Sequence, residues 1–338
     1  MFHSPRKPSK ISDPTSRTSA KGSPFGRRTF LAGLAATGTA VYPRTGRPAI
    51  LTVVNVSSSL EDDAAALLYG IHNGLFARRG LDVRLQPASV GSAAAAAIAG
   101  GSLQFAKSST LAMAAGYLHG VPFTIVAPST LSTSEIPIAG LLVRPDSPIR
   151  SGKDCAGRTF CSSGLRDLKS LSIMAWVDQT GGDSKTLKFV EIPSPATLEA
   201  IAEGRVDGTA ISNPVLYDAV SSGQLRNVGN PFDAIAKRFV ASAWFTTKDY
   251  AASSPDVVRG FVLALRESAR YAMAHPADMA DVLAPFLHDD VARLRKMNRT
   301  TVGIGLDPRE YQPVIDAAAK YGILTRSFPA AEFLTVVS

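Results

Sequence analysis

The sequence of 338 residues has few of the side chains from which metal sites, disulfide frameworks and nucleophilic active sites are built. It contains two cysteines and five histidines, and no two histidines have metal-motif spacing. No complete G-x-S-x-G elbow, P-loop or G-x-G-x-x-G fingerprint occurs. We therefore expect no metal, no cofactor and no catalytic residue, and a protein that is not an enzyme.

The two cysteines, Cys155 and Cys161, lie on either side of Gly157. In an oxidising compartment they could pair across a turn, or they could be two separately buried thiols. The spacing does not decide between these alternatives.

Long apolar runs are also missing, because no stretch approaches the roughly 20 apolar residues of a membrane span. The N-terminus instead has a basic polar stretch, then Arg27-Arg28-Thr29-Phe30-Leu31, then small apolar residues up to Val41. This order is typical of a secretory signal peptide. We assign residues 1–47 to a signal peptide and disordered N-terminus, with cleavage near Ala40. The paired arginines resemble a twin-arginine export signal, although Gly26 and Ala32 depart from its usual pattern.

An excess of positive charge is absent outside this segment. Nine of the 36 Lys and Arg and one of the 28 Asp and Glu lie in residues 1–47, which leaves 27 of each in the remainder. The net charge of +8 is thus a feature of the N-terminus. It does not support nucleic-acid binding, which requires a basic face on the folded part.

Strand and helix patterns alternate along residues 50–212, which predicts parallel β/α units and an α/β fold. Ser58 and Glu61 have capping-box spacing before a helix, and Gly80 is placed to end it. The expected strands are 50–56, 81–85, 103–106, 123–127, 138–143, 158–161, 187–192, 206–212 and 239–246. The expected helices include 91–99, 110–118, 168–179 and 195–202, and the residues after 246 are helical.

One short sequence motif occurs twice. Residues 97–103 read AIAGGSL and residues 200–206 read AIAEGRV, 103 positions later. Each copy ends a helix at glycine and turns into a strand, so the carboxyl ends of the two strands point the same way. The repeat predicts two similar lobes with a cleft between them.

The segment Gly70 to Val83 resembles the "G-x-F-x-x-x-G-L-D-V" signature of nitrate/sulfonate/taurine-type (NMT1/THI5-like, SsuA-like) solute-binding proteins of ABC importers. The resemblance extends over about residues 50–330. It implies a two-lobed periplasmic-binding-protein fold (type II, two crossovers), in which each lobe is a mostly parallel sheet flanked by helices. Lobe 1 would be 48–136 plus 240–338, and lobe 2 would be 137–239.

Candidate ligand contacts lie where expected strands end, because ligands of open α/β sheets sit beyond the carboxyl ends of the strands, against helix N-termini. After the first strand, Asp62 and its neighbour Asp63 could instead align with the helix dipole, and the serines could be simple caps. Carboxylates there favour a ligand with hydroxyl or amine donors. Lys107 could be solvated, Asn213 could form an ordinary turn, and core packing is an alternative role for Trp244. The candidates are Ser58, Ser59, Leu60, Asp62, Lys107, Ser108, Ser109, Ser162, Ser163, Gly164, Asn213 and Trp244.

The resemblance implies a periplasmic, exported and monomeric protein that captures a small organic or oxyanionic solute of the sulfonate-, nitrate- or pyrimidine-like class. Its partner would be an ABC permease in the inner membrane. Two alternatives are a THI5-like enzyme on the same scaffold and a ligand-presenting subunit of a sensor. The cysteine-rich motif of the pyrimidine-synthesising relatives is absent from this sequence.

Overall fold

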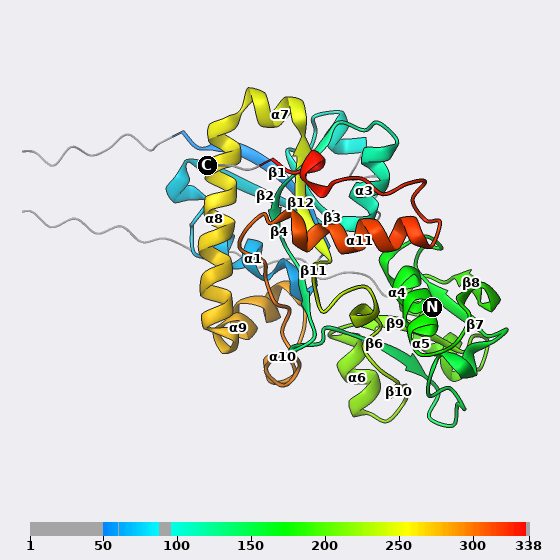
Figure 1. The fold of residues 1–338 in the computed structure, drawn as a ribbon. Coiled ribbons are helices and arrows are strands. Elements are labelled where there is room, and N and C mark those ends of the chain that lie inside the picture. The colour runs from blue at the N-terminus through cyan, green and yellow to red at the C-terminus, as the bar shows by residue number, and fades with distance from the viewer. Residues whose placement is uncertain (1–49, 60, 88–95, 336–338) are drawn as a thin grey trace, which may run out of the picture. The chain divides into compact units, whose positions relative to one another are not determined.

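The computed structural model describes residues 50–59, 61–87 and 96–335, which all belong to one compact unit, Pro48–Ser338. This unit contains two five-stranded sheets (Figure 1). The first has the spatial order β2 (Leu81–Pro87), β1 (Thr52–Ser58), β3 (Phe105–Ser109), β12 (Ser242–Thr247) and β4 (Phe123–Pro128). The second has the order β8 (Lys188–Glu191), β7 (Thr159–Ser162), β9 (Gly208–Ser212), β6 (Ala139–Val143) and β10 (Arg226–Asn227).

The two sheets share one topology. Apart from one reversed strand in each sheet, β12 or β6, the first strand along the chain pairs in parallel with the second and third, β1 with β2 and β3, and β7 with β8 and β9. The reversed strand pairs antiparallel with the third and fourth of these strands, β12 with β3 and β4, and β6 with β9 and β10. Four of the five strands therefore run in the same direction, which confirms the predicted mostly parallel sheets.

Helices cover both sheets, as the prediction requires. Near the first sheet are α1 (Ala65–His72), α3 (Thr110–Leu118), α7 (Lys248–Ser253), α8 (Pro255–Ala274), α9 (Pro276–Leu287), α10 (Val291–Lys296) and α11 (Pro308–Lys320). Near the second are α4 (Leu168–Gln179), α5 (Ser194–Ala202) and α6 (Val215–Ser221). Short 3-10 helices are η1 (Asp62–Ala64), η2 (Ala77–Arg79), η3 (Gly152–Cys155), η4 (Ser184–Thr186), η5 (Pro231–Ala234) and η6 (Ala330–Phe333).

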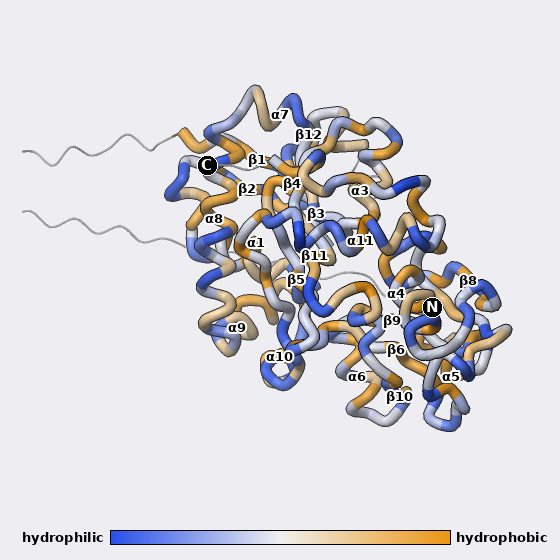
Figure 2. The backbone as a smooth tube through the Cα atoms, in the orientation of Figure 1, coloured by the Kyte–Doolittle hydropathy of each residue, from blue (hydrophilic) through white to orange (hydrophobic). Residues whose placement is uncertain are grey.

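Strand alternation explains why both faces of each sheet are covered. Phe105 belongs to the apolar cluster that contains residues of α1 and α8, and the next residue, Ala106, belongs to the cluster of α3 and α11. In the second sheet, Phe160 packs in the cluster of α4 and Cys161 in that of α5 and α6. Successive strand side chains point to opposite faces, so these strands are buried on both sides. Strands β4 and β6 are buried along their whole length and are largely apolar (Figure 2).

The two copies of the repeated motif, residues 97–103 and 200–206, form the same turn. Gly101 and Gly204 both have φ of 75°, which is the left-handed region that glycine adopts without strain. In the first copy the amide of Leu103 donates to the carbonyl of Ala97 (3.2 Å), and in the second copy Val206 donates to Ala200 (3.3 Å). The turns lead into the equivalent strands β3 and β9. The internal repeat is therefore confirmed.

The chain passes between the two sheets twice, from β4 to β6 and from β10 to β12. The two passing segments contain β5 (Leu131–Thr133) and β11 (Arg238–Val240), which pair antiparallel as a separate two-stranded sheet. The prediction of one continuous strand over residues 239–246 is therefore wrong, because the structure has two strands there. The chain leaves β11 at Val240 and resumes as β12 at Ser242, because its pairing partner changes from β5 to β3 and β4.

Most other elements follow the prediction closely, and α3 and α4 have the predicted limits. The prediction that Gly80 ends the first helix is wrong, because α1 ends at His72 and Gly80 instead ends η2. The predicted capping box is wrong, because Glu61 precedes η1 without a side-chain cap and the Ser58 hydroxyl donates to the carbonyl of Ser59. The strand β1 simply runs on to Ser58, where the serines are sheet residues. Of the predicted helix 91–99, residues 96–99 are helical and the rest lies outside the described residues, as do residues 1–47.

Candidate functional site

A cavity of about 290 Å³ lies between the two sheets, at the carboxyl ends of β3 and β9. From the first half of the unit it is lined by Glu61, Asp63, Ser109, Thr130, Ala241 and Ser242. From the second half it is lined by Ile138, Asp167, Leu168, Lys169, Ser212 and Phe232. A cavity at strand ends facing helix N-termini is the usual ligand position in open α/β sheets.

The repeat places matching residues on the two sides of this cavity. Ser109 and Ser212 end the equivalent strands β3 and β9, 103 positions apart. Asp63 and Asp167, 104 positions apart, follow the equivalent strands β1 and β7 and precede the helices α1 and α4. Equivalent structural elements of the two halves therefore line the cavity from its two sides.

The first half presents a buried ion pair. The ammonium of Lys107, whose side chain is 4% exposed, contacts Oδ1 of Asp63. The hydroxyl of Thr130 donates to Oδ2 of the same carboxylate (3.2 Å), and Ser242 donates to it at 3.4 Å and to Thr130 at 2.9 Å. Because a buried charge is tolerated only when it is paired and hydrogen-bonded, this network fixes the Asp63 carboxylate at the cavity wall.

The second half holds its aspartate without a cation. Asp167 is the N-cap of α4 and accepts a hydrogen bond from the amide of Ser170 (2.8 Å). Its other oxygen accepts one from the hydroxyl of Ser162 (2.5 Å). The partial positive charge of the helix N-terminus favours a carboxylate at this position.

Two charged side chains of the lining, Glu61 and Lys169, have no hydrogen-bond or ion-pair partner among the described residues. Glu61 is an exposed residue, although it lies in the cleft among the other charged groups of the lining. Loss of hydration there, and next the charge of Asp63, raise the pKa of Glu61, while Lys107 and Lys169 oppose the shift.

The predicted contact residues fall into three groups. Ser109 lines the cavity, and Lys107 and Ser162 lie behind it, each bonded to an aspartate of the lining. Ser58, Ser59, Ser108, Ser163 and Gly164 lie on or beside the strands that lead to the cavity and are not part of its lining. Leu60 lies outside the described residues.

The other three candidates point elsewhere. Asp62 is 2% exposed and pairs with Arg299, and its carboxylate accepts a hydrogen bond from the amide of Thr300 (2.6 Å). The Asn213 side chain donates to the carbonyl of Asn298 (2.9 Å) and lines a separate cavity of about 370 Å³. Trp244 is 1% exposed and packs edge-on against Phe261, with ring centroids 5.9 Å apart.

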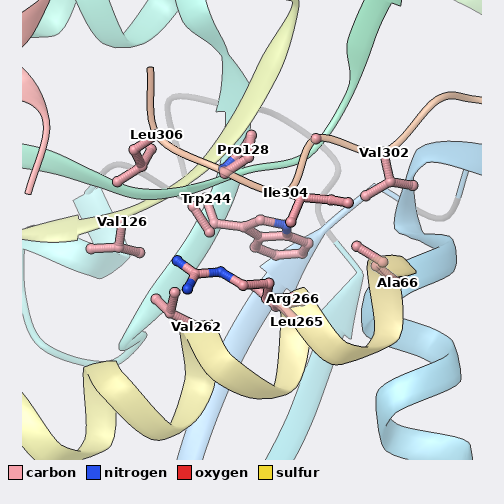
Figure 3. Close-up of a pocket in the computed structure, with 13 residues that line it drawn as sticks. Ala66, Val126, Pro128, Trp244, Val262, Leu265, Arg266, Val302, Ile304 and Leu306 are labelled. Atoms are coloured by element: carbon pink, nitrogen blue, oxygen red, sulfur yellow. The ribbon is translucent and has the colours of Figure 1, made fainter. Parts of the chain in front are cut away.

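Trp244 also borders a small void on the α8 side of the first sheet (Figure 3). Arg266 points into the same void, whose remaining lining is largely apolar. Its volume of about 10 Å³ has room for no more than about one water molecule. This void is too small to hold a solute.

Sequence reasoning named Asp63 only as a neighbour and missed Glu61, Asp167, Lys169 and Ser212 as lining residues. The repeat contained a signal that could have found one of them, because adding its spacing of 103 to the candidate Ser109 gives Ser212. The same spacing takes Asp63 to Arg166, one residue before Asp167. Glu61 and Lys169 have no such signal, because neither has a charged counterpart in the other copy.

Other features of the described residues bear on the remaining expectations. Cys155 and Cys161 are separately buried free thiols, and burial raises the pKa of Cys155 to about 11. Within residues 50–59, 61–87 and 96–335, no group of three or more His, Cys, Asp or Glu is placed to hold a metal ion. Over the same ranges, no helix combines the length and apolarity that crossing a membrane requires.

The model of the protein family described as "NMT1/THI5 like" matches residues 61–279. The alkanesulfonate-binding protein SsuA from Xanthomonas axonopodis pv. citri, bound to MOPS, is 15% identical, with a TM-score of 0.69 over 84% of this chain and 98% of that chain. The periplasmic nitrate-binding protein NrtA from Synechocystis PCC 6803 is 13% identical, with a TM-score of 0.68 over 83% of this chain and 84% of that chain.

The desulfurization enzyme DSZB is also similar, at 14% identity and a TM-score of 0.62 over 84% of this chain and 96% of that chain. Comparison with curated proteins finds no match. The structural likenesses, together with the two sheets and their topology, show the periplasmic-binding-protein fold that the sequence predicted.

Proposed function

Because the chain belongs to the NMT1/THI5-like family, we propose that it is the exported solute-binding component of an ABC importer. It captures a small organic or oxyanionic solute, of the sulfonate-, nitrate- or pyrimidine-like class, and delivers it to an inner-membrane permease. The observation that carries this proposal is the polar cavity between the two sheets, at the carboxyl ends of β3 and β9.

The lining supports binding better than catalysis. Its polar groups are three carboxylates, one ammonium and several hydroxyls, and these groups can hold and orient a small polar molecule from two sides. SsuA and NrtA, two of the similar structures, are described as binding proteins. Affinity then depends on contacts that form in full only when the two sides close on the solute.

We propose that residues 48–136 plus 240–338 form one lobe and residues 137–239 the other, joined by the two passing segments that contain β5 and β11. The polar contacts that must break for the lobes to separate include the ion pair of Arg293 with Asp218. Arg166 donates to the carbonyl of Gly322 (2.8 Å), Asn213 to that of Asn298 (2.9 Å) and Asn298 to that of Pro137 (3.3 Å). Closure by hinge motion would trap the solute, because it buries the solute against both helix N-termini.

We further propose export to the periplasm through the signal in residues 1–47, by the twin-arginine route, and action as a monomer without nucleic acid. The competing function is an enzyme on the same scaffold, which the likeness to DSZB supports. A ligand-presenting subunit of a sensor is a third possibility, with the same cavity and a different partner.

The first test is native mass spectrometry of the protein purified without refolding, followed by denaturation to identify any bound molecule. A stoichiometric small molecule would support the proposal and name its solute. A thermal-shift panel of chemically diverse solutes follows, since a ligand that binds only the folded state raises the melting temperature. Small-angle scattering should then show compaction with the active solute.

A matched pair of variants ties the response to the cavity. Ser212→Leu fills the cavity wall and should abolish the thermal shift, whereas Ser253→Leu, at an exposed position of α7, should leave it unchanged. Absence of a ligand in every screen, or chemical turnover of the bound molecule, would contradict the proposal and favour the enzyme.

A further inference from the structure

The two charged groups of the cavity that lack partners belong to opposite sides of it. Glu61 precedes η1 in the first half, and Lys169 lies in the first turn of α4 in the second half. Neither has a hydrogen-bond or ion-pair partner among the described residues. The other charges of the lining are occupied, since Asp63 pairs with Lys107 and Asp167 accepts from Ser162 and Ser170.

The position of Lys169 is unfavourable for the helix itself. It is the second residue of a 12-residue helix, whose N-terminus carries partial positive charge. An ammonium at this end is repelled by the helix dipole, so helix stability gives no reason for it. Its place at the cavity wall supplies one, because the ammonium and the helix N-terminus together favour an acceptor group of a ligand.

The charges around the cavity also oppose a simple anion. Glu61, Asp63 and Asp167 contribute three negative charges, and Lys107 and Lys169 contribute two positive charges. A bare anion would find one free cation and would lie in the same small cavity as the free carboxylate of Glu61. The anion and the Glu61 carboxylate carry the same charge and would lie close together in a partly dehydrated cavity. They repel each other, so binding of an anion alone is disfavoured.

We propose that the cavity selects solutes carrying a protonated amine, with Glu61 as the residue that binds the amine and Lys169 as the residue that binds an acceptor or acid group at the other end. This inference rests on the proposed function, because it names the solute class of that cavity. It separates this chain from a receptor for nitrate or for simple alkanesulfonates.

The test uses purified full-length protein and three probes with the same carbon chain: 4-aminobutanoate, butanoate and butylammonium. The thermal-shift panel is divided in the same way, into solutes with an amine, anions without an amine, and neutral solutes. Calorimetry then measures the affinity of the strongest ligand. We expect that ligand to carry an amine, and we expect 4-aminobutanoate to bind more tightly than butanoate.

Two variants and one control test which side chain binds which end of the ligand. Glu61→Gln should weaken the amine-bearing ligand by about tenfold to hundredfold, the loss expected for a charge-assisted hydrogen bond. Lys169→Met should weaken 4-aminobutanoate and should not weaken butylammonium, which has no acceptor group for the Lys169 ammonium and is repelled by its charge. Glu199→Gln, at an exposed position of α5, is the matched control and should change neither affinity. Circular dichroism and melting temperature show whether each variant is folded.

The outcomes separate the two levels of the proposal. If the strongest ligand is an anion without an amine, and Glu61→Gln binds it as tightly or more tightly, solute binding stands and the selection of amines is overturned. If an amine-bearing ligand binds equally well to Glu61→Gln, Glu61 is not the selecting residue and the inference is again overturned. If no solute of any class binds, the proposed function itself fails.

Discussion

The two halves of this protein use the same backbone frame with different chemistry at the cavity. Both place a serine at the end of an equivalent strand, β3 or β9, and an aspartate between strand β1 or β7 and the helix that follows it. In the first half the aspartate is neutralised by the buried Lys107, whereas in the second it is held by the N-terminus of α4 and the hydroxyl of Ser162. A repeat therefore conserves geometry, while the identity of a few side chains sets the charge that each side offers a solute.

The largest difference between the halves should appear on removal of the two aspartates. Asp63→Ala leaves Lys107 buried without its partner, and we expect it to lower the free energy of unfolding by about 3–5 kcal/mol. Asp167→Ala removes a helix cap and should cost about 1 kcal/mol. Urea denaturation of both variants measures the difference.

The double variant Asp63→Ala/Lys107→Met controls for the cause of this loss. It removes the unpaired charge and should recover most of the stability lost in Asp63→Ala, because an ion pair replaced by apolar groups is often close to neutral. Equal losses for Asp63→Ala and Asp167→Ala would show that the two halves do not differ in the proposed way.

A smaller effect should show where the halves are alike. Gly101→Ala and Gly204→Ala each place a side chain at φ of 75° and should each lower the free energy of unfolding by about 1–2 kcal/mol. A Cβ at Gly101 meets nothing within 4 Å, and one at Gly204 meets only the end of the flexible Arg144 side chain at 2.5 Å. Thermal or urea unfolding that shows one variant unaffected would contradict the equivalence of the two turns.

The smallest effect concerns how the ionisation of Glu61, which has no partner among the described residues, makes the stability of the protein depend on pH. The folded state raises the pKa of Glu61, through lost hydration and then Asp63, so the folded protein binds this proton more tightly than the unfolded chain. The contribution of Glu61 to stability should therefore fall slightly as pH rises from the ordinary glutamate pKa through the raised one. The difference in melting temperature between the unchanged protein and Glu61→Gln, both ligand-free, measures this contribution over the range, and Glu199→Gln should follow the unchanged protein.

Much of the fold follows from local sequence patterns. The apolar strands and the amphipathic helices are encoded by nearby residues, which is why α3 and α4 have the predicted limits. Where the prediction failed, a distant segment decided the outcome. The chain breaks at Ala241 because β11 and β12 pair with different strands, and no local pattern records that change of partner.

The candidate site was predicted to the level of the strand ends and no further. The alternation and the repeat identified which strands end at the cleft, because a parallel sheet presents all its carboxyl ends at one edge. Strand ends contain several polar residues, however, and only Ser109 of the predicted contacts lies in the cavity lining. The packing of the helices and passing segments around the cleft selects which of the neighbours face it.

The sequence by itself determined the order of strands and helices, the two matching turns and the even balance of charge outside the N-terminus, since these depend on composition and on neighbouring residues. The tertiary structure alone decided the roles of adjacent residues such as Asp62 and Asp63. Successive residues of a 3-10 turn point about 120° apart. One carboxylate consequently meets Arg299 and is buried, and the other meets Lys107 at the cavity wall. Both partners come from distant parts of the chain, so only the folded structure brings each of them to its carboxylate.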